Sequence, residues 1–193
     1  YYYDVYNANP NTTPPDSTAL VHFSIAYGNY YNSGSGEMDT GSLVNPTKAI
    51  YSQYKNYLLN PTDAFFSFKT GSYTNSGTVT DLTTTVTGSS IYVITFATNR
   101  YKDRVDEGQL EFSLTGSNGL FTFIDDSSLI KTQQDVYNII SGSVENGVPT
   151  PYYSGNVINY KSLGLFYPKT GTIILNATAL SNNIGVFVNE SNV

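Results

Sequence analysis

The chain has 193 residues, with 9 Lys and Arg against 15 Asp and Glu, for a formal net charge of -6 at pH 7. This length fits one domain with its own hydrophobic core. The scarcity of basic residues argues against a nucleic-acid-binding surface, and the lack of cysteine excludes disulfides, thiolate nucleophiles and sulfur-ligated metals.

Apolar runs in the sequence are all shorter than the roughly 20 residues that a membrane-spanning helix needs, so we expect no membrane partner. Charged residues make up 12% of the chain and 18 residues are tyrosine, whereas globular domains carry about 25% charged residues. Tyrosine combines a large apolar ring with a polar tip and is enriched at protein interfaces. This composition favours extracellular or virion material.

The first third of the chain predicts strands and one helix. Residues 1–6 read as a strand, and three prolines in the turn-rich stretch that follows make residues 1–18 a candidate N-terminal arm. Residues 19–27 alternate large apolar with mixed side chains, as a half-buried strand does. Residues 45–59 predict a helix, because Asn45 can cap it, Pro46 suits its first position, and apolar residues recur every three or four positions.

The middle of the chain predicts more strands. Residues 64–69 are a short candidate, and residues 71–88, rich in Thr, Ser and Gly, predict an exposed hairpin or a loop. Residues 91–96 form the strongest strand pattern, and residues 110–114 with 120–124 predict a hairpin.

The last third continues this alternation. Residues 135–141 predict a strand, and residues 142–155, with two prolines, predict a loop. Residues 162–167 and 172–175 predict two antiparallel strands around a turn in which Gly171 takes a positive φ. A last strand is predicted at residues 184–188.

These elements together predict a mainly β fold with antiparallel, sandwich-like sheets and one principal helix at about residues 45–59. The whole chain, residues 1–193, is expected to be a single domain. A β-rich α+β fold is the alternative.

Charge is concentrated in one segment, where six of the eight residues from Arg100 to Glu107 are ionisable and alternate in sign. Alternation favours mutual ion pairing, and exposed pairs contribute only about 0–1 kcal/mol each. If the segment contributes strongly, we therefore expect it to act through partly buried contacts or through contacts between subunits. The candidate assembly contacts are Arg100, Tyr101, Lys102, Asp103, Arg104 and Glu107.

Catalytic and metal chemistry find little support in the sequence. His22 is the single histidine and lies in a predicted strand between apolar residues, which favours a structural role. A calcium site would have to use the carboxylates of Asp103, Asp106, Glu107, Asp125 and Asp126, but no calcium-loop spacing is present.

Glycoside hydrolysis would use two carboxylates among Asp103, Glu107 and Glu111. Basic neighbours lower carboxylate pKa values, whereas a general acid needs a raised pKa, so ion pairing is the better interpretation. We expect no catalytic, cofactor or metal site.

Several segments, spread across most of the chain in matching order, resemble virion structural proteins of contractile-tailed phages of cyanobacteria and related marine hosts. The matching segments are residues 23–28, 49–56, 91–94, 100–104, 120–127, 137–143, 164–168 and 173–176.

The resemblance implies a non-enzymatic building block of the tail, baseplate or fibre apparatus, assembled in the host cytoplasm. Its expected partners are other copies of the chain and other virion proteins, with no nucleic acid and no membrane. The alternative is a β-rich carbohydrate-binding or adhesion module whose tyrosines stack on a host-surface glycan.

Overall fold

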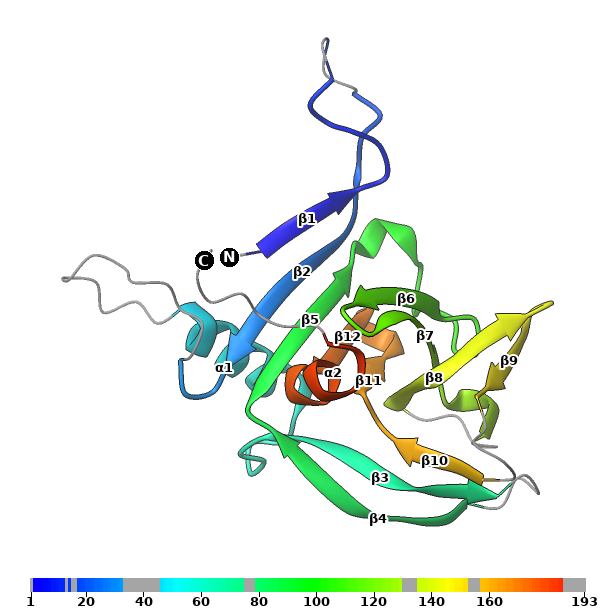
Figure 1. The fold of residues 1–193 in the computed structure, drawn as a ribbon. Coiled ribbons are helices and arrows are strands. Elements are labelled where there is room, and N and C mark those ends of the chain that lie inside the picture. Colours follow the sequence, from blue (N-terminus) through cyan, green and yellow to red (C-terminus); the bar gives the residue numbers. More distant parts are fainter. Residues whose placement is uncertain are drawn as a thin grey trace.

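The computed structural model describes residues 2–12, 14, 17–32, 46–74, 79–129, 135–152 and 157–185. The largest unit among these residues is one curled antiparallel sheet of nine strands (Figure 1). The fold is therefore mainly β, as the sequence predicts. From one edge to the other, the strands are β1 (Tyr2–Tyr6), β2 (Val21–Asn29), β5 (Ser90–Phe96), β12 (Thr172–Asn176), β11 (Gly164–Tyr167), β8 (Tyr137–Glu145), β7 (Gly119–Asp125) and β6 (Glu111–Gly116), with β9 (Val148–Pro151) paired to β8.

A second, three-stranded antiparallel sheet has the order β10-β3-β4. Its strands are β3 (Phe66–Thr74), β4 (Val79–Gly88) and β10 (Val157–Lys161). The hairpin alternative for residues 71–88 is therefore confirmed. The predicted loop at residues 142–155 is wrong where the structure describes it, because β8 runs on to Glu145 and β9 returns beside it; residues 153–155 of that prediction lie outside the described residues.

Helix α1 (Pro46–Leu58) confirms the predicted helix, although its expected cap, Asn45, lies outside the described residues. A second helix, α2 (Ala177–Ile184), is present that the sequence analysis does not predict. The strand predicted at residues 184–188 is wrong at Ile184, because this residue is the last of α2. Residues 186–188 of that prediction lie outside the described part. Three 3₁₀ turns are also present, at η1 (Thr98–Arg100), η2 (Ser127–Leu129) and η3 (Pro168–Thr170). None of the helices in the described ranges is long and apolar enough to cross a membrane.

The two helices cover opposite faces of the large sheet. Successive residues of β5 point to opposite faces, as strand geometry requires: Val93 packs in the cluster that contains α1, and Ile94 packs against the cluster that contains α2. The cores on the two sides of β5 and β12 are thus separate, with α1 on one side and α2 on the other.

Tyr51 of α1 joins this helix to the small sheet. Its side chain is fully buried, its hydroxyl donates to the carbonyl of Gly88 at 2.7 Å, and the same oxygen accepts from the N–H of Phe66 at 3.2 Å. The hydroxyl therefore satisfies backbone groups at the end of β4 and the start of β3.

The N-terminal region extends the sheet at its edge. Strand β1 pairs with β2, and the described residues between them, 7–12, 14 and 17–20, project from the body of the protein (Figure 1). The separate arm at residues 1–18 stays a prediction, with the observation that β1 within it is part of the sheet.

Candidate functional site

The charged segment links two strands that are far apart in the sheet. It leaves β5, the third strand from one edge, and enters β6, the strand at the opposite edge. The connection therefore crosses one end of the sheet, and on its way the N–H of Val105 donates to the carbonyl of Pro168 at 3.0 Å.

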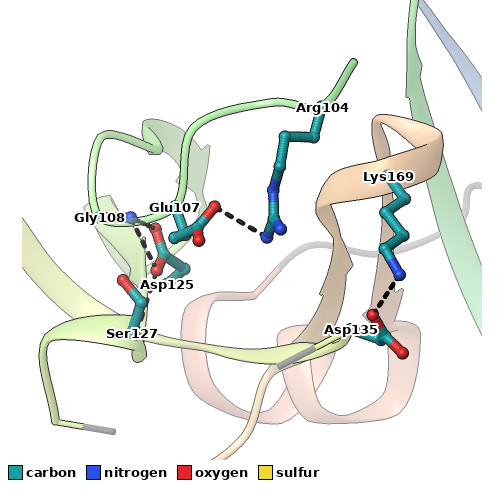
Figure 2. A network of polar contacts seen from close by, with 7 residues as sticks. All are labelled: Arg104, Glu107, Gly108, Asp125, Ser127, Asp135 and Lys169. Atoms are coloured by element: carbon teal, nitrogen blue, oxygen red, sulfur yellow. Dashed lines mark hydrogen bonds and ion pairs between the residues drawn. The ribbon is translucent and has the colours of Figure 1, made fainter. Parts of the chain in front are cut away.

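A buried carboxylate holds the second half of the segment in place. Asp125, at the end of β7, is fully buried and accepts from the N–H of Gly108 at 2.9 and 3.1 Å and from the N–H of Ser127 at 3.1 Å (Figure 2). Gly108 has a φ of 78°, a left-handed conformation in which glycine is favoured.

Tyr101 holds the first half of the charged segment in place. A Cβ added to Gly171 would lie 2.6 Å from Cε1 of Tyr101, so the tyrosine ring packs directly on this glycine. Burial, with a smaller contribution from Tyr57, raises the pKa of Tyr101. Gly171 itself has a φ of 57°, which confirms the positive φ predicted for this turn.

Two ion pairs lie beside these anchors (Figure 2). Nη2 of Arg104 is 2.8 Å from Oε2 of Glu107, and Nζ of Lys169 is 2.6 Å from Oδ1 of Asp135. The Lys169 hydrogen bond and charge lower the pKa of Asp135, with a smaller contribution from Arg104.

Arg104 is incompletely satisfied in this arrangement. Its Nε and Nη2 are both buried and have no hydrogen-bond acceptor among the described residues. Nη2 lies within ion-pair distance of Glu107, but the contact does not have the geometry of a hydrogen bond. The pair therefore supplies charge compensation without the two parallel hydrogen bonds that make Arg–carboxylate pairs strong.

The alternating signs predict ion pairs throughout the segment, but within its described residues the Arg104–Glu107 pair is the one that forms. Arg100, Lys102, Asp103 and Asp106 are all exposed, and none of them has an ion-pair partner in the described part of the chain. The backbone of the segment is thus held by contacts with the rest of the protein, whereas four of its charged side chains face solvent.

The segment also lines a pocket of about 790 Å³. Its lining mixes cations, carboxylates and amides with apolar side chains, and His22 and Phe96 border it from the sheet. The lining residues are His22, Phe96, Asn99, Arg100, Tyr101, Lys102, Arg104, Val105, Asp106, Gln109, Leu110 and Glu111.

Four of the six candidate assembly contacts line this pocket and two do not. Arg100, Tyr101, Lys102 and Arg104 line the pocket, whereas Asp103 and Glu107 do not. The sequence did not predict that His22 and Phe96 border this pocket or that Asp125 holds the segment by hydrogen bonds, because the proximity of these residues to the segment depends on the strand order.

Two of the carboxylates considered for calcium or hydrolysis, Asp126 and Glu111, accept hydrogen bonds from other parts of the protein. Asp126 is fully buried and accepts from the backbone N–H of Asn138 at 2.8 Å and from its side-chain amide at 2.9 Å. Glu111 accepts from the N–H of Val144. No group of three or more metal-binding side chains is found in the described ranges.

No family model, curated protein or solved structure matches this chain.

Proposed function

We propose that this chain is a non-enzymatic structural protein of a tailed-phage virion, in the tail, baseplate or fibre apparatus, and that it acts through protein–protein assembly interfaces. Its partners are other copies of the chain and other virion proteins. The sequence resemblance supplies the virion context for this proposal, and the surface supports the assembly role.

The observation that carries the proposal is the charged segment. Its backbone is fixed by Asp125, by the Val105–Pro168 hydrogen bond and by the packing of Tyr101, while Arg100 and Lys102 remain exposed and outside any described ion pair. Fixing a loop before binding lowers the entropy lost on association. Exposed charges with no intramolecular role steer association and fix its register.

Exposed tyrosines give independent support. Tyr3 is 73% exposed, Tyr31 70% and Tyr57 66%. They lie on different parts of the fold, in β1, in the turn after β2 and in α1, so large amphipathic rings are presented by more than one element of the surface. A protein that meets several neighbours in a particle needs such surfaces on more than one side.

Sedimentation velocity on the purified chain, from micromolar concentrations to about 1 mM, tests the proposal, because interfaces weaker than this contribute little. We expect concentration-dependent oligomers that Arg100→Ala and Lys102→Ala weaken by about tenfold each, or about 1.4 kcal/mol. Lys48→Ala is the matched control, since Lys48 is an exposed cation on α1. A wild-type monomer at every concentration, with no binding to phage particles, contradicts the proposal.

A second candidate is a carbohydrate-binding or adhesion module, which the pocket beside His22 favours. Donors from Arg100 and Gln109 and the carboxylate of Asp106 face the same space as the ring of Phe96. Sugar hydroxyls need both donors and acceptors. Binding on a glycan array that Gln109→Ala abolishes would promote this candidate over assembly.

A further inference from the structure

The guanidinium of Arg104 retains hydrogen-bonding capacity that the protein does not use. Its Nε and Nη2 are buried and have no hydrogen-bond acceptor in the described part of the chain. Buried polar groups are almost always hydrogen-bonded, and a guanidinium binds carboxylates through two parallel N–H donors. Glu107 compensates the charge of Arg104 at 2.8 Å without satisfying these donors (Figure 2). An oxyanion from outside the chain can supply the missing acceptor.

Arg104 shares the pocket with two further cations. It lines the pocket and 23% of its side-chain surface is exposed, so a bound group can reach the side chain. Arg100 and Lys102 line the same pocket, are exposed, and have no ion-pair partner among the described residues. Three of the nine Lys and Arg residues therefore line one pocket of a chain whose net charge is -6. This arrangement attracts a negatively charged group.

Two carboxylates in the lining limit the charge that a ligand can carry. Asp106 and Glu111 are exposed and face the same pocket. A polyphosphate or a nucleic-acid backbone carries several charges and would be repelled by both carboxylates at close range. A ligand with a single carboxylate meets less repulsion, and its N–H groups can donate to Asp106. The pocket therefore suits a weakly anionic ligand that also carries donors.

Apolar side chains complete the lining. Phe96, Val105 and Leu110 contribute to it beside the charged groups. The volume of about 790 Å³ lies within the range of about 300–1,000 Å³ that is usual for ligand pockets. A neutral sugar would leave Arg100 and Lys102 without a counter-charge, whereas an acidic peptide combines a carboxylate, backbone N–H donors and apolar side chains.

We propose that this pocket binds a short acidic peptide segment of a partner protein, in which an Asp or Glu stands next to a large apolar residue. This inference rests on the proposed assembly function and names the chemistry of the partner at the charged segment. The carboxylate of the peptide lies between Arg100 and Lys102, and the guanidinium of Arg104 turns toward it. The apolar side chain packs on Phe96 and Val105.

An array of random hexapeptides, incubated with the purified chain, is the first test. We expect enrichment of peptides in which Asp or Glu is adjacent to Leu, Ile, Phe or Tyr. The signal should fall as the salt concentration rises, because salt screens exposed charges. Enrichment of basic peptides or of peptides without Asp and Glu overturns the proposal, and so does an array without enrichment.

Charge variants locate the binding site, with fluorescence anisotropy of the strongest array peptide as the measurement. Arg100→Gln and Lys102→Gln are each expected to weaken binding about fivefold, the value of one close charge pair in water. Lys48→Gln is the matched control, since Lys48 is an exposed cation on α1. Equal losses in all three variants would mean nonspecific attraction and overturn the pocket as the site.

Asp106→Asn supplies a change of opposite sign. It removes a negative charge that faces the peptide carboxylate, so binding should become about two- to fivefold tighter. Asp103→Asn is its control, because Asp103 is exposed on the same segment but does not line the pocket. A general disturbance of the segment would weaken binding in both variants, and that result contradicts the proposal.

The outcomes separate this inference from the proposed function. A chain that oligomerises or binds phage particles but enriches no acidic peptide overturns peptide recognition and retains the assembly role. A chain that binds acidic peptides through Arg100 and Lys102 but neither oligomerises nor binds phage particles supports the pocket and contradicts the virion role. Glycan binding that Gln109→Ala abolishes, without any peptide binding, overturns the inference in favour of a carbohydrate-binding module.

Discussion

Oδ2 of Asp125 lies 2.9 Å from the backbone nitrogen of Gly108, and Oδ1 lies 3.1 Å from the same atom. Through this contact the last residue of β7 holds the charged segment that precedes β6. The carboxylate is fully buried and also accepts from the N–H of Ser127. One side chain therefore fixes two connections, one before β6 and one after β7, and positions the exposed charges of the candidate site.

Replacing this carboxylate tests its structural role. Asp125→Ala leaves the N–H groups of Gly108 and Ser127 without their acceptor, and each unsatisfied buried group costs about 1–3 kcal/mol. We expect the free energy of unfolding, measured by urea titration, to fall by about 2–4 kcal/mol. Asp103→Ala is the control, because Asp103 is exposed on the same segment, and surface changes of this kind stay within about 0.5 kcal/mol. Equal effects of the two variants would show that Asp125 is not an anchor.

The hydroxyl of Tyr51 is a second internal anchor with a matched control on the same helix. Tyr51→Phe removes the partner of the Gly88 carbonyl and of the Phe66 N–H while it keeps the ring in the core. The expected loss of stability is about 1–3 kcal/mol. Tyr57→Phe removes a hydroxyl that is on the exposed side of α1 and should change stability by less than about 0.5 kcal/mol. A loss in Tyr57→Phe as large as that in Tyr51→Phe would contradict the assignment.

Much of the secondary structure could be predicted because its signals are local. Helix α1 begins at Pro46 and repeats apolar residues at helical spacing, and the β6–β7 hairpin alternates on both sides of a turn at Ser117 and Asn118. Each of these signals lies within a dozen or so neighbouring residues, where propensity and periodicity decide the conformation.

The wrong secondary-structure predictions concern segments whose conformation depends on tertiary structure. Pro149 and Pro151 suggest a loop, yet β9 pairs with β8 and with no other described strand, and an edge strand tolerates residues without an N–H donor. Helix α2 was missed because it is short, although Asn176 caps it by accepting from the N–H of Ala179 at 3.1 Å.

The candidate site was only half predictable. The charge pattern of residues 100–107 identified an unusual segment, but its pairing depended on where the fold placed each side chain. Glu107 lies beside Arg104, whereas Asp103 and Asp106 face solvent. The pocket with His22 and Phe96 requires the order of β2, β5 and β6 in the sheet, which local sequence does not contain.

The contact between Gly116 and the end of α2 predicts a strong packing effect. A Cβ at Gly116 would lie 1.8 Å from the carbonyl oxygen of Ile184, and backbone atoms must move to relieve this overlap. The movement would disrupt the hydrogen bonds from Ser117 to Gly185 and from Asn118 to Ile184, both 3.3 Å long.

Gly116→Ala is therefore expected to lower the free energy of unfolding by about 3 kcal/mol, at the upper end of the usual cost of overpacking. Thr115→Ala, at an exposed position of the same strand, should cost less than about 1 kcal/mol. Urea unfolding followed by circular dichroism distinguishes the two. A wild-type midpoint for Gly116→Ala would mean that α2 does not pack against the hairpin.

Buried tyrosines predict a loss of stability at alkaline pH. Burial, and to a smaller extent Tyr27, raises the pKa of Tyr92 to about 12, and burial also raises the pKa values of Tyr51 and Tyr167. In the unfolded chain these phenols titrate at about pH 10. Above that pH the unfolded state has released protons that the folded state still holds, so stability is fully present below about pH 10 and falls as pH rises through the folded pKa values.

The measurement is the urea midpoint as a function of pH, combined with phenolate absorbance of the folded protein. Tyr92→Phe should make the alkaline decline of the urea midpoint shallower, because it removes one proton that only the folded state retains. A Tyr92→Phe variant with the same alkaline decline as the wild-type protein would show that the Tyr92 hydroxyl ionises equally easily in the folded and unfolded states.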